Sequence, residues 1–254
     1  MKILLIGGSG HVGTFITPHL KHRHDLRVLD VREPSHDVEF IRGSITDVND
    51  LTRALSGVDS FINLVMWSEQ DGNESDQSVA EIEQHYAVNT VGLHLLLHVA
   101  HGCGVTRGVH TSTLTVHDRQ RVWYPAEERV PLDAPGVYGL TKGFGELICQ
   151  YFARWFDMNL IALRISMPST RAQWLERRAQ GRMETEDGVR LFALDEEDLA
   201  QAYLSALAAV QVGHGRFDAV YVVGDELEEE HNLSKARRLL GWEPREYVSD
   251  GGER

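Results

Sequence analysis

The chain alternates short, continuous apolar runs with longer stretches of helical periodicity. The apolar runs predict strands at residues 3–6, 26–29, 40–41, 60–65, 108–111, 159–165 and 219–223. The helical pattern predicts helices over 12–21, 48–56 (with Asp47 as N-cap), 79–101, 137–156 and 195–210. Strands that alternate with helices pair in parallel, and continuous apolar strands fit a sheet covered on both faces. We therefore expect a doubly wound, Rossmann-type α/β fold that binds ligands at the carboxyl ends of its strands.

Composition narrows the class of protein. Lys and Arg number 25 and Asp and Glu 38, so the net charge is −13, and an acidic surface repels nucleic acid. Cys103 and Cys149 make no disulfide framework, and no apolar run is long enough to span a bilayer. The start of the chain reads as a strand rather than a targeting segment. These features predict a cytoplasmic protein that binds neither membranes nor nucleic acid.

A glycine-rich turn follows the first strand. Residues 7–13 read GGSGHVG, with Gly7, Gly10 and Gly13 between a strand and a helix. Small residues let the backbone approach a pyrophosphate, whose charge is stabilised at the helix N-terminus. The last glycine allows the helix and strand to pack closely. The turn predicts a dinucleotide site.

The second strand ends in Asp30, which supports the same interpretation. A carboxylate at this position accepts hydrogen bonds from the adenosine ribose and repels a 2′-phosphate, which favours NAD. The alternative is an aspartate that merely ends the strand in a turn. Arg32, two residues later, keeps NADP open as a second cofactor.

Tyr138 and Lys142 lie at i and i+4 in the predicted helix 137–156 and so share a face. An ammonium beside a phenol favours the phenolate and lowers its pKa, so Tyr138 could exchange a proton with a substrate hydroxyl. The strand before this helix ends in three hydroxyl residues, Thr111, Ser112 and Thr113. One of them could hold the substrate oxygen, although Ser and Thr are common at strand ends.

Taken in order, these motifs resemble the extended short-chain dehydrogenases/reductases, also called the NAD-dependent epimerase/dehydratase family. The resemblance covers nearly the whole chain. Its main segments are GGSGHVG, DSFINLV, AVNTVGLHLLL, VHTSTLTVHD, VYGLTKGFGE, ALRISMP and SKARRLLGWEP. It divides the chain into a cofactor-binding core with the catalytic helix (1–165) and a part with a small substrate lobe and the remaining sheet and helix elements (166–254).

The resemblance implies a role for each matched residue. Thr113 would be the active-site hydroxyl, with Ser112 as the alternate, and Tyr138 the general acid/base. Lys142 would lower the tyrosine pKa and bind ribose. The implied cofactor site comprises Gly7, Gly10, His11, Val12, Gly13, Asp30, Ser44, Ile45, Leu64, Val65, Asn89, Tyr138 and Lys142.

Three positions depart from the family pattern. Ser44 stands where an aspartate often meets the adenine amine. Bulky Val65, Met66 and Trp67 follow the fourth strand, where small residues are usual, and would reshape the pocket. His117 replaces a tyrosine. These departures put the substrate in doubt and leave the Tyr-Lys pair intact.

The short chain leaves little room for a lobe that grips a nucleotide sugar, so we expect a small substrate. The size and motif order resemble the short uronate dehydrogenases, in which a sugar acid is oxidised to a lactone. Ser68 and Thr113 would then bind the sugar. Arg190 would clamp its carboxylate, with Arg171 and Arg177 as rivals, although solvated arginines would look the same.

Three functions stay open at this point: an NAD-dependent sugar or sugar-acid dehydrogenase, an epimerase or dehydratase with an internal NAD cycle, and a non-catalytic NAD(P)-binding sensor. Paired helices of this family suggest a homodimer. His94, His98 and His101 share a helical face, but no carboxylate or cysteine completes a set, so we expect no metal site.

Overall fold

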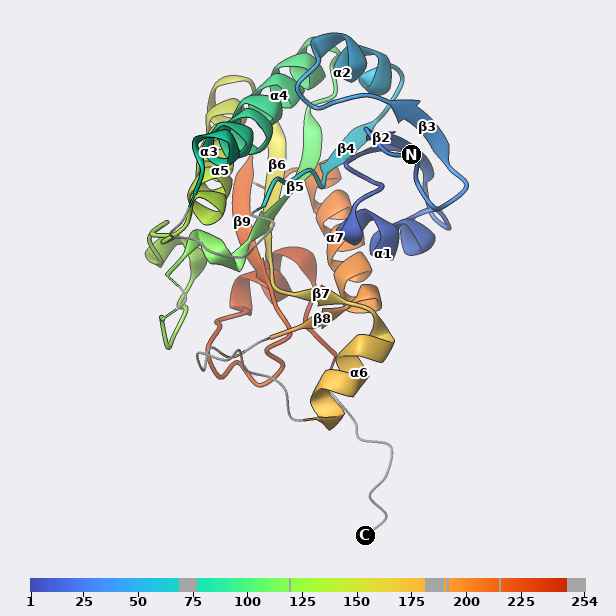
Figure 1. Ribbon diagram of the computed structural model, residues 1–254. Helices are drawn as coiled ribbons and strands as arrows, with labels where there is room; N and C mark the ends of the chain where they lie inside the picture. Colours follow the sequence, from blue (N-terminus) through green and yellow to red (C-terminus); the bar gives the residue numbers. More distant parts are fainter. Residues whose placement is uncertain (69–76, 119, 181–189, 191, 215, 246–254) are drawn as a thin grey trace.

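The computed structural model describes residues 1–68, 77–118, 120–180, 190, 192–214 and 216–245. Within these ranges seven strands form one parallel sheet in the order β3-β2-β1-β4-β5-β6-β9, as Figure 1 shows. The strands are β1 (Lys2–Ile6), β2 (Asp25–Asp30), β3 (Glu39–Arg42), β4 (Ser60–Asn63), β5 (Arg107–Thr113), β6 (Asn159–Ile165) and β9 (Phe217–Val222). The predicted doubly wound fold is confirmed.

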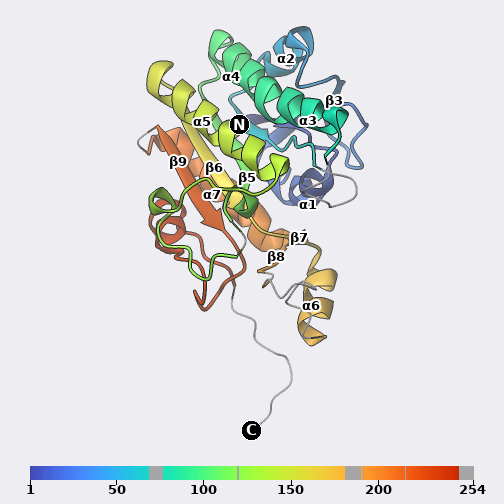
Figure 2. The same ribbon diagram turned by 60° about the vertical axis from the view of Figure 1, so that its left-hand side comes forward.

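Helices cover both faces of the sheet. On one face lie α1 (His11–Leu20) and α7 (Glu196–Val212), which contact each other over a core that includes Ile16 and Leu207. The other face is covered by α2 (Val48–Leu55), α4 (Leu93–Gly102) and α5 (Val137–Trp155), with α3 (Val79–His85) beside α5 (Figure 2). Apart from the edge strand β3, the strands are mostly buried, which explains why they read as continuous apolar runs.

Local signals fix several helix starts. The Asp47 carboxylate accepts hydrogen bonds from the backbone N–H groups of Asn49 and Asp50, so the predicted N-cap of α2 is confirmed. Asp195 caps α7 in the same way, with bonds from Glu197 and Asp198.

The segment predicted as one helix over 79–101 has three parts. Between α3 and α4, residues Tyr86–Gly92 form a π-helix, whose wider turn a 3.6-residue periodicity does not reveal. A second π-helical turn, Ala236–Leu240, follows β9. The wider turn before α4 contains Asn89, whose side chain bonds to Trp67 and Thr141.

After β6 the chain forms a small unit beside the carboxyl ends of the large sheet (Figure 1). It consists of β7 (Pro168–Ser169), which pairs in parallel with β8 (Leu194–Asp195), and α6 (Arg171–Ala179). The chain then returns to the large sheet through α7 and β9. None of the helices within the described ranges has the length and apolar character needed to cross a membrane.

Candidate active site

The turn from β1 to α1 is built to approach an anion. Gly7 has φ = 80°, a backbone conformation that favours glycine, and its carbonyl accepts a hydrogen bond from Gly10 N at 3.1 Å. A Cβ on Gly13 would lie 2.2 Å from the Gly8 carbonyl oxygen, so only glycine lets α1 pack this closely on the turn. The first turn of α1 contains no acidic side chain. Its N–H groups and helix dipole can therefore face a phosphate.

Asp30 ends β2 beside this turn and is 9% exposed. Its carboxylate accepts hydrogen bonds from Ser9 N at 2.9 Å and from Arg32 N at 3.0 Å. A carboxylate offers about four lone-pair sites, so acceptor capacity remains for ribose hydroxyls. The exposed Arg32 also lines the adjoining cavity, and its guanidinium keeps a 2′-phosphate possible.

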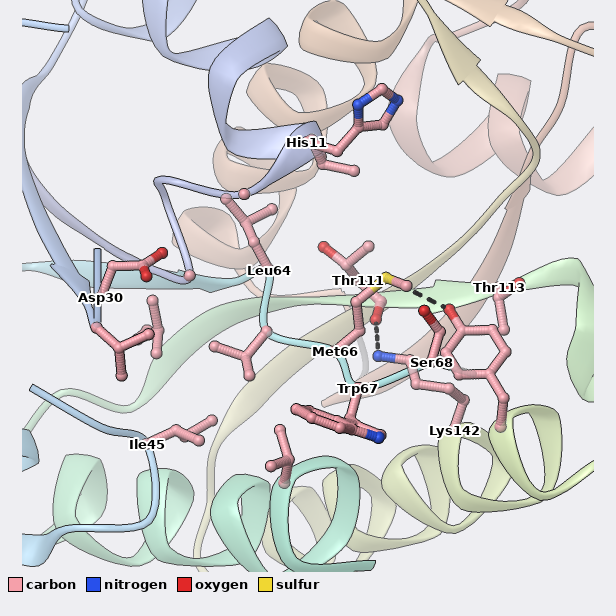
Figure 3. Close-up of a pocket in the computed structure, with 18 of the residues that line it drawn as sticks. His11, Asp30, Ile45, Leu64, Met66, Trp67, Ser68, Thr111, Thr113 and Lys142 are labelled. Carbon is pink, nitrogen blue, oxygen red and sulfur yellow. Dashed lines mark hydrogen bonds between the residues drawn. The ribbon is translucent and has the colours of Figure 1, made fainter. Parts of the chain in front are cut away.

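One cavity of about 740 Å³ runs from the glycine turn to the start of α5 (Figure 3). Its size lies within the range of small-molecule and cofactor sites. Most of the residues predicted for the site line it: Gly7, Gly10, His11, Val12, Asp30, Ser44, Ile45, Leu64, Val65, Ser68, Ser112, Thr113, Tyr138 and Lys142. The glycine turn at one end and the Tyr-Lys pair at the other thus share one cavity.

At the cavity end near β3, the backbone N–H of Ser44 donates to the Asp50 carboxylate at 2.9 Å. That bond, together with the Arg53 guanidinium, lowers the pKa of Asp50. The Ser44 hydroxyl bonds to Thr46 Oγ1 at 2.8 Å, and Ile45 is buried. Together with the glycine turn and Asp30, these residues fit an adenine dinucleotide.

The opposite end of the cavity is formed by β5 and the first turn of α5. The Lys142 ammonium is buried and donates to the Thr111 carbonyl oxygen at 2.6 Å. Burial lowers its pKa to about 8. The Tyr138 hydroxyl donates to the Met66 thioether at 3.7 Å, and Figure 3 marks both contacts with dashed lines.

The three strand-end hydroxyls have different partners. Thr111 Oγ1 lies 2.6 Å from the buried Tyr203 hydroxyl, and Ser112 donates to Glu146 at 2.6 Å. Thr113 Oγ1 accepts from Thr115 N at 3.2 Å at the edge of the cavity. Two of the hydroxyls are thus held within the core, so Thr113 is the best placed of the three to meet a substrate.

A buried polar network lies behind Ser112. Arg164 on β6 forms two hydrogen bonds with the Glu146 carboxylate, at 2.9 and 2.6 Å, and both side chains are about 5% exposed or less. Arg164 also donates to His117 Nε2 at 3.0 Å, and the Tyr221 hydroxyl lies 3.3 Å from the same nitrogen. We did not expect this network from the motifs. A charged residue inside the apolar strand around Arg164 is the signal that could have revealed it.

The network keeps His117 neutral. Its Nδ1–H donates to the Pro131 carbonyl at 2.6 Å, while Nε2 accepts from Arg164. Burial and the nearby guanidinium lower its pKa from 6.5 to about 4.

This histidine makes stability depend on pH. The unfolded chain takes up the proton near pH 6.5 and the folded chain only near pH 4, so stability falls as pH drops through this window. At pH 5 we expect a loss of about 2 kcal/mol from His117 alone. Urea unfolding at pH 7 and pH 5 measures it. The His117→Gln variant should show a smaller difference between the two pH values, and an equal difference would contradict this assignment.

Two of the predicted cofactor residues lie outside the cavity lining and act on its walls. Gly13 sets the packing of α1, as described above. Asn89, in the π-helix, accepts from Trp67 N at 2.8 Å and donates to Trp67 O at 2.9 Å and to Thr141 Oγ1 at 3.0 Å. It therefore fixes the segment after β4 against α5.

The arginines expected to bind a substrate carboxylate do not line the cavity. Arg190 is paired with Glu229 and, at 3.5 Å, with Glu230. Its rival Arg171 is paired with Asp195 and lies over the Trp174 ring. Neither arginine lines the cavity, and nor does Arg177. Ser68 and Thr113, the other predicted substrate ligands, do line it.

The histidines of α4 have aromatic neighbours. His94 packs on Tyr151 and Phe152, with ring centroids 6.2 and 5.1 Å apart. Across the described part of the chain, no three His, Cys, Asp or Glu side chains are grouped so that they could hold a metal ion.

Comparison with protein families gives one match over most of the chain. The profile of the NAD dependent epimerase/dehydratase family matches residues 3–173. Among curated relatives, an L-arabinose 1-dehydrogenase (NAD(P)(+)) from Haloferax volcanii is 25% identical over 96% of both chains. The first matches are much longer proteins: the chain covers 36% of y4nG from Sinorhizobium fredii and 32% of a Mycobacterium tuberculosis 3 beta-hydroxysteroid dehydrogenase/isomerase.

Two solved structures have the same fold. A short-chain dehydrogenase/reductase superfamily protein from Agrobacterium tumefaciens with bound NAD has a TM-score of 0.74 at 22% identity, over 97% of this chain and 93% of that one. A glucuronic acid dehydrogenase from Chromohalobacter salexigens has a TM-score of 0.74 at 22% identity, over 100% and 90%. At this identity the likeness establishes the fold alone.

Proposed function

Because the chain belongs to the NAD dependent epimerase/dehydratase family, we propose that it is an NAD-dependent dehydrogenase of a small sugar or sugar acid. The observation that carries the proposal is the shared cavity. It joins the glycine turn and Asp30 to Tyr138 and Lys142. The L-arabinose 1-dehydrogenase, one of the relatives that match over nearly full length, is a sugar dehydrogenase, which supports the same substrate class.

Some residues would bind the cofactor, and others would orient the substrate and transfer its proton. The glycine turn would hold the pyrophosphate and Asp30 the adenosine ribose. Bound NAD would supply the hydride acceptor. Thr113 would orient the substrate hydroxyl, and Tyr138 as phenolate would take its proton while the carbinol carbon loses a hydride. The Lys142 ammonium, one helical turn from Tyr138, favours that phenolate.

A test follows the absorbance of reduced nicotinamide while the protein and NAD meet a panel of aldoses, uronates and polyols. A rise with one substrate, equal to the product formed, supports the dehydrogenase. Conversion of a sugar without free NADH would indicate instead an epimerase or dehydratase with an internal redox cycle. NAD binding without any conversion would indicate a sensor.

We also propose a homodimer formed through α5. An apolar stripe of five exposed residues repeats every three or four positions along this helix: Leu140, Phe144, Leu147, Tyr151 and Trp155, exposed by 38–66%. A monomer that left this stripe in water would expose a continuous apolar surface, which is typical of a contact site.

Replacing Leu147, at the centre of the α5 stripe, by glutamate should convert the dimer to a monomer, because the charge would be buried in the interface. Sedimentation velocity measures this. Val212→Glu is the matched control, since Val212 is an exposed apolar residue at the end of α7. If wild type and both variants sediment alike, the α5 stripe is not the interface.

A further inference from the structure

The hydroxyl expected to react contacts a side chain that the family pattern does not supply. Met66 follows β4, and its thioether accepts the hydrogen bond of the Tyr138 hydroxyl. The residue is 47% exposed and lines the cavity. Thioether sulfur is a weak acceptor, and methionine is flexible. A substrate hydroxyl can therefore replace this contact by offering Tyr138 a stronger hydrogen bond.

The neighbouring Trp67 is held in place. Asn89 bonds both its backbone N–H and its carbonyl, at 2.8 and 2.9 Å, so the main chain here is fixed against the π-helix. Trp67 also lines the cavity, and Figure 3 shows its ring beside the segment that follows β4. The Met66 side chain can therefore turn while the main chain at Trp67 stays in place, and both side chains give the cavity apolar surface.

At this end of the cavity, the described lining offers an anion no guanidinium. Of the arginines in the described ranges, only Arg32 lines the cavity, and it lies beside Asp30. Lys142 is buried and donates to Thr111 O. A carboxylate that packs against a thioether and an indole loses hydration without gaining a guanidinium, which is unfavourable.

We propose that Met66 is a specificity-determining residue. Its thioether contacts the Tyr138 hydroxyl in the free protein, and with Trp67 it selects neutral sugars, whose C–H faces pack on these apolar side chains, over the corresponding sugar acids. This inference rests on the proposed dehydrogenase function and narrows its substrate class.

The test compares matched pairs that differ only at one carbon: galactose with galacturonate, and glucose with glucuronate. With NAD present, we expect kcat/KM to be at least about tenfold higher for the neutral member of the pair that reacts. Higher kcat/KM for the uronate would overturn the proposal.

Two variants test the role of Met66 itself. Met66→Arg places a guanidinium beside Tyr138 and should shift the neutral-to-acid ratio of kcat/KM toward the uronate by about tenfold or more. Met66→Leu keeps the volume and the apolar character, so the ratio should stay near that of wild type. A ratio that does not move in Met66→Arg would refute Met66 as the selecting residue.

Measurements of sugar binding show whether the specificity inference fails independently of the proposed dehydrogenase function. If wild type reduces no NAD with these pairs or with any other member of the panel, the dehydrogenase proposal fails. The specificity inference is then judged by calorimetric titration of the same sugars into NAD-loaded Tyr138→Phe protein, with and without Met66→Arg. Tighter binding of the neutral member, shifted toward the uronate by Met66→Arg, supports the inference. Tighter binding of the uronate without that substitution, or no binding of either, overturns it.

Discussion

Tyr138→Phe is expected to lower kcat by about 100- to 10,000-fold, the range typical of a lost general acid/base. The substitution removes one oxygen and leaves the ring that packs at the start of α5. The glycine turn and Asp30 lie at the other end of the cavity, so NAD binding should change little. Initial rates of NADH formation and calorimetric titration with NAD measure the two effects separately.

The control for this variant is Tyr151→Phe, since Tyr151 lies on the same helix but in the α5 stripe, 45% exposed in one chain and outside the cavity lining, and the phenylalanine keeps the stripe apolar. Its rate should equal that of wild type. If Tyr138→Phe retains full activity, Tyr138 is not the proton acceptor. If it loses NAD binding together with activity, the residue acts on cofactor binding instead.

The buried pair behind the active site should give the largest effect on stability. Arg164→Met leaves the Glu146 carboxylate without its guanidinium partner at a site where both side chains are about 5% exposed or less. Removal of one member of such a pair is expected to lower the free energy of unfolding by about 3–5 kcal/mol. Guanidinium chloride unfolding at pH 7, followed by circular dichroism, measures the loss.

The double variant Arg164→Met, Glu146→Leu shows whether the stability loss comes from the unpaired buried carboxylate or from lost packing. It replaces both charges with apolar side chains, which is often neutral or stabilising for buried pairs. We therefore expect it to unfold at a higher denaturant concentration than Arg164→Met alone. A double variant less stable than the single one would mean that the wider network with Ser112 and His117, rather than the unpaired carboxylate, sets the cost.

The fold could be predicted because its main signals are local. Continuous apolar runs and a correctly placed cap at Asp47 mark elements without knowledge of their neighbours. The two-residue strands β7 and β8 are too short for any periodicity to indicate. The π-helix was missed for a different reason: one wider turn changes the helical phase, and hydrophobic spacing averages over it.

The residues of the candidate site could likewise be predicted only where they lie in local motifs. The glycine turn, Asp30, Tyr138 and Lys142 lie in ordered motifs, and the structure brings them to one cavity. The arginines could not be placed from spacing, because their partners are remote in sequence. Arg190 pairs with Glu229, 39 residues away. The pairing of Glu146 with Arg164 could not be predicted for the same reason, because Glu146 lies on α5 and Arg164 on β6.

The Asn89 amide has a consequence for how this pocket can change over evolution. Its bonds hold the main chain at Trp67 and helix α5 at Thr141 in a fixed relation. Substitutions at Met66 or Ser68, on either side of Trp67, can therefore alter the cavity lining without displacing α5. If Tyr138 and Lys142 act as proposed, substrate preference can then change by single amino-acid replacements while their geometry is preserved, so divergence between related proteins should accumulate first in this segment.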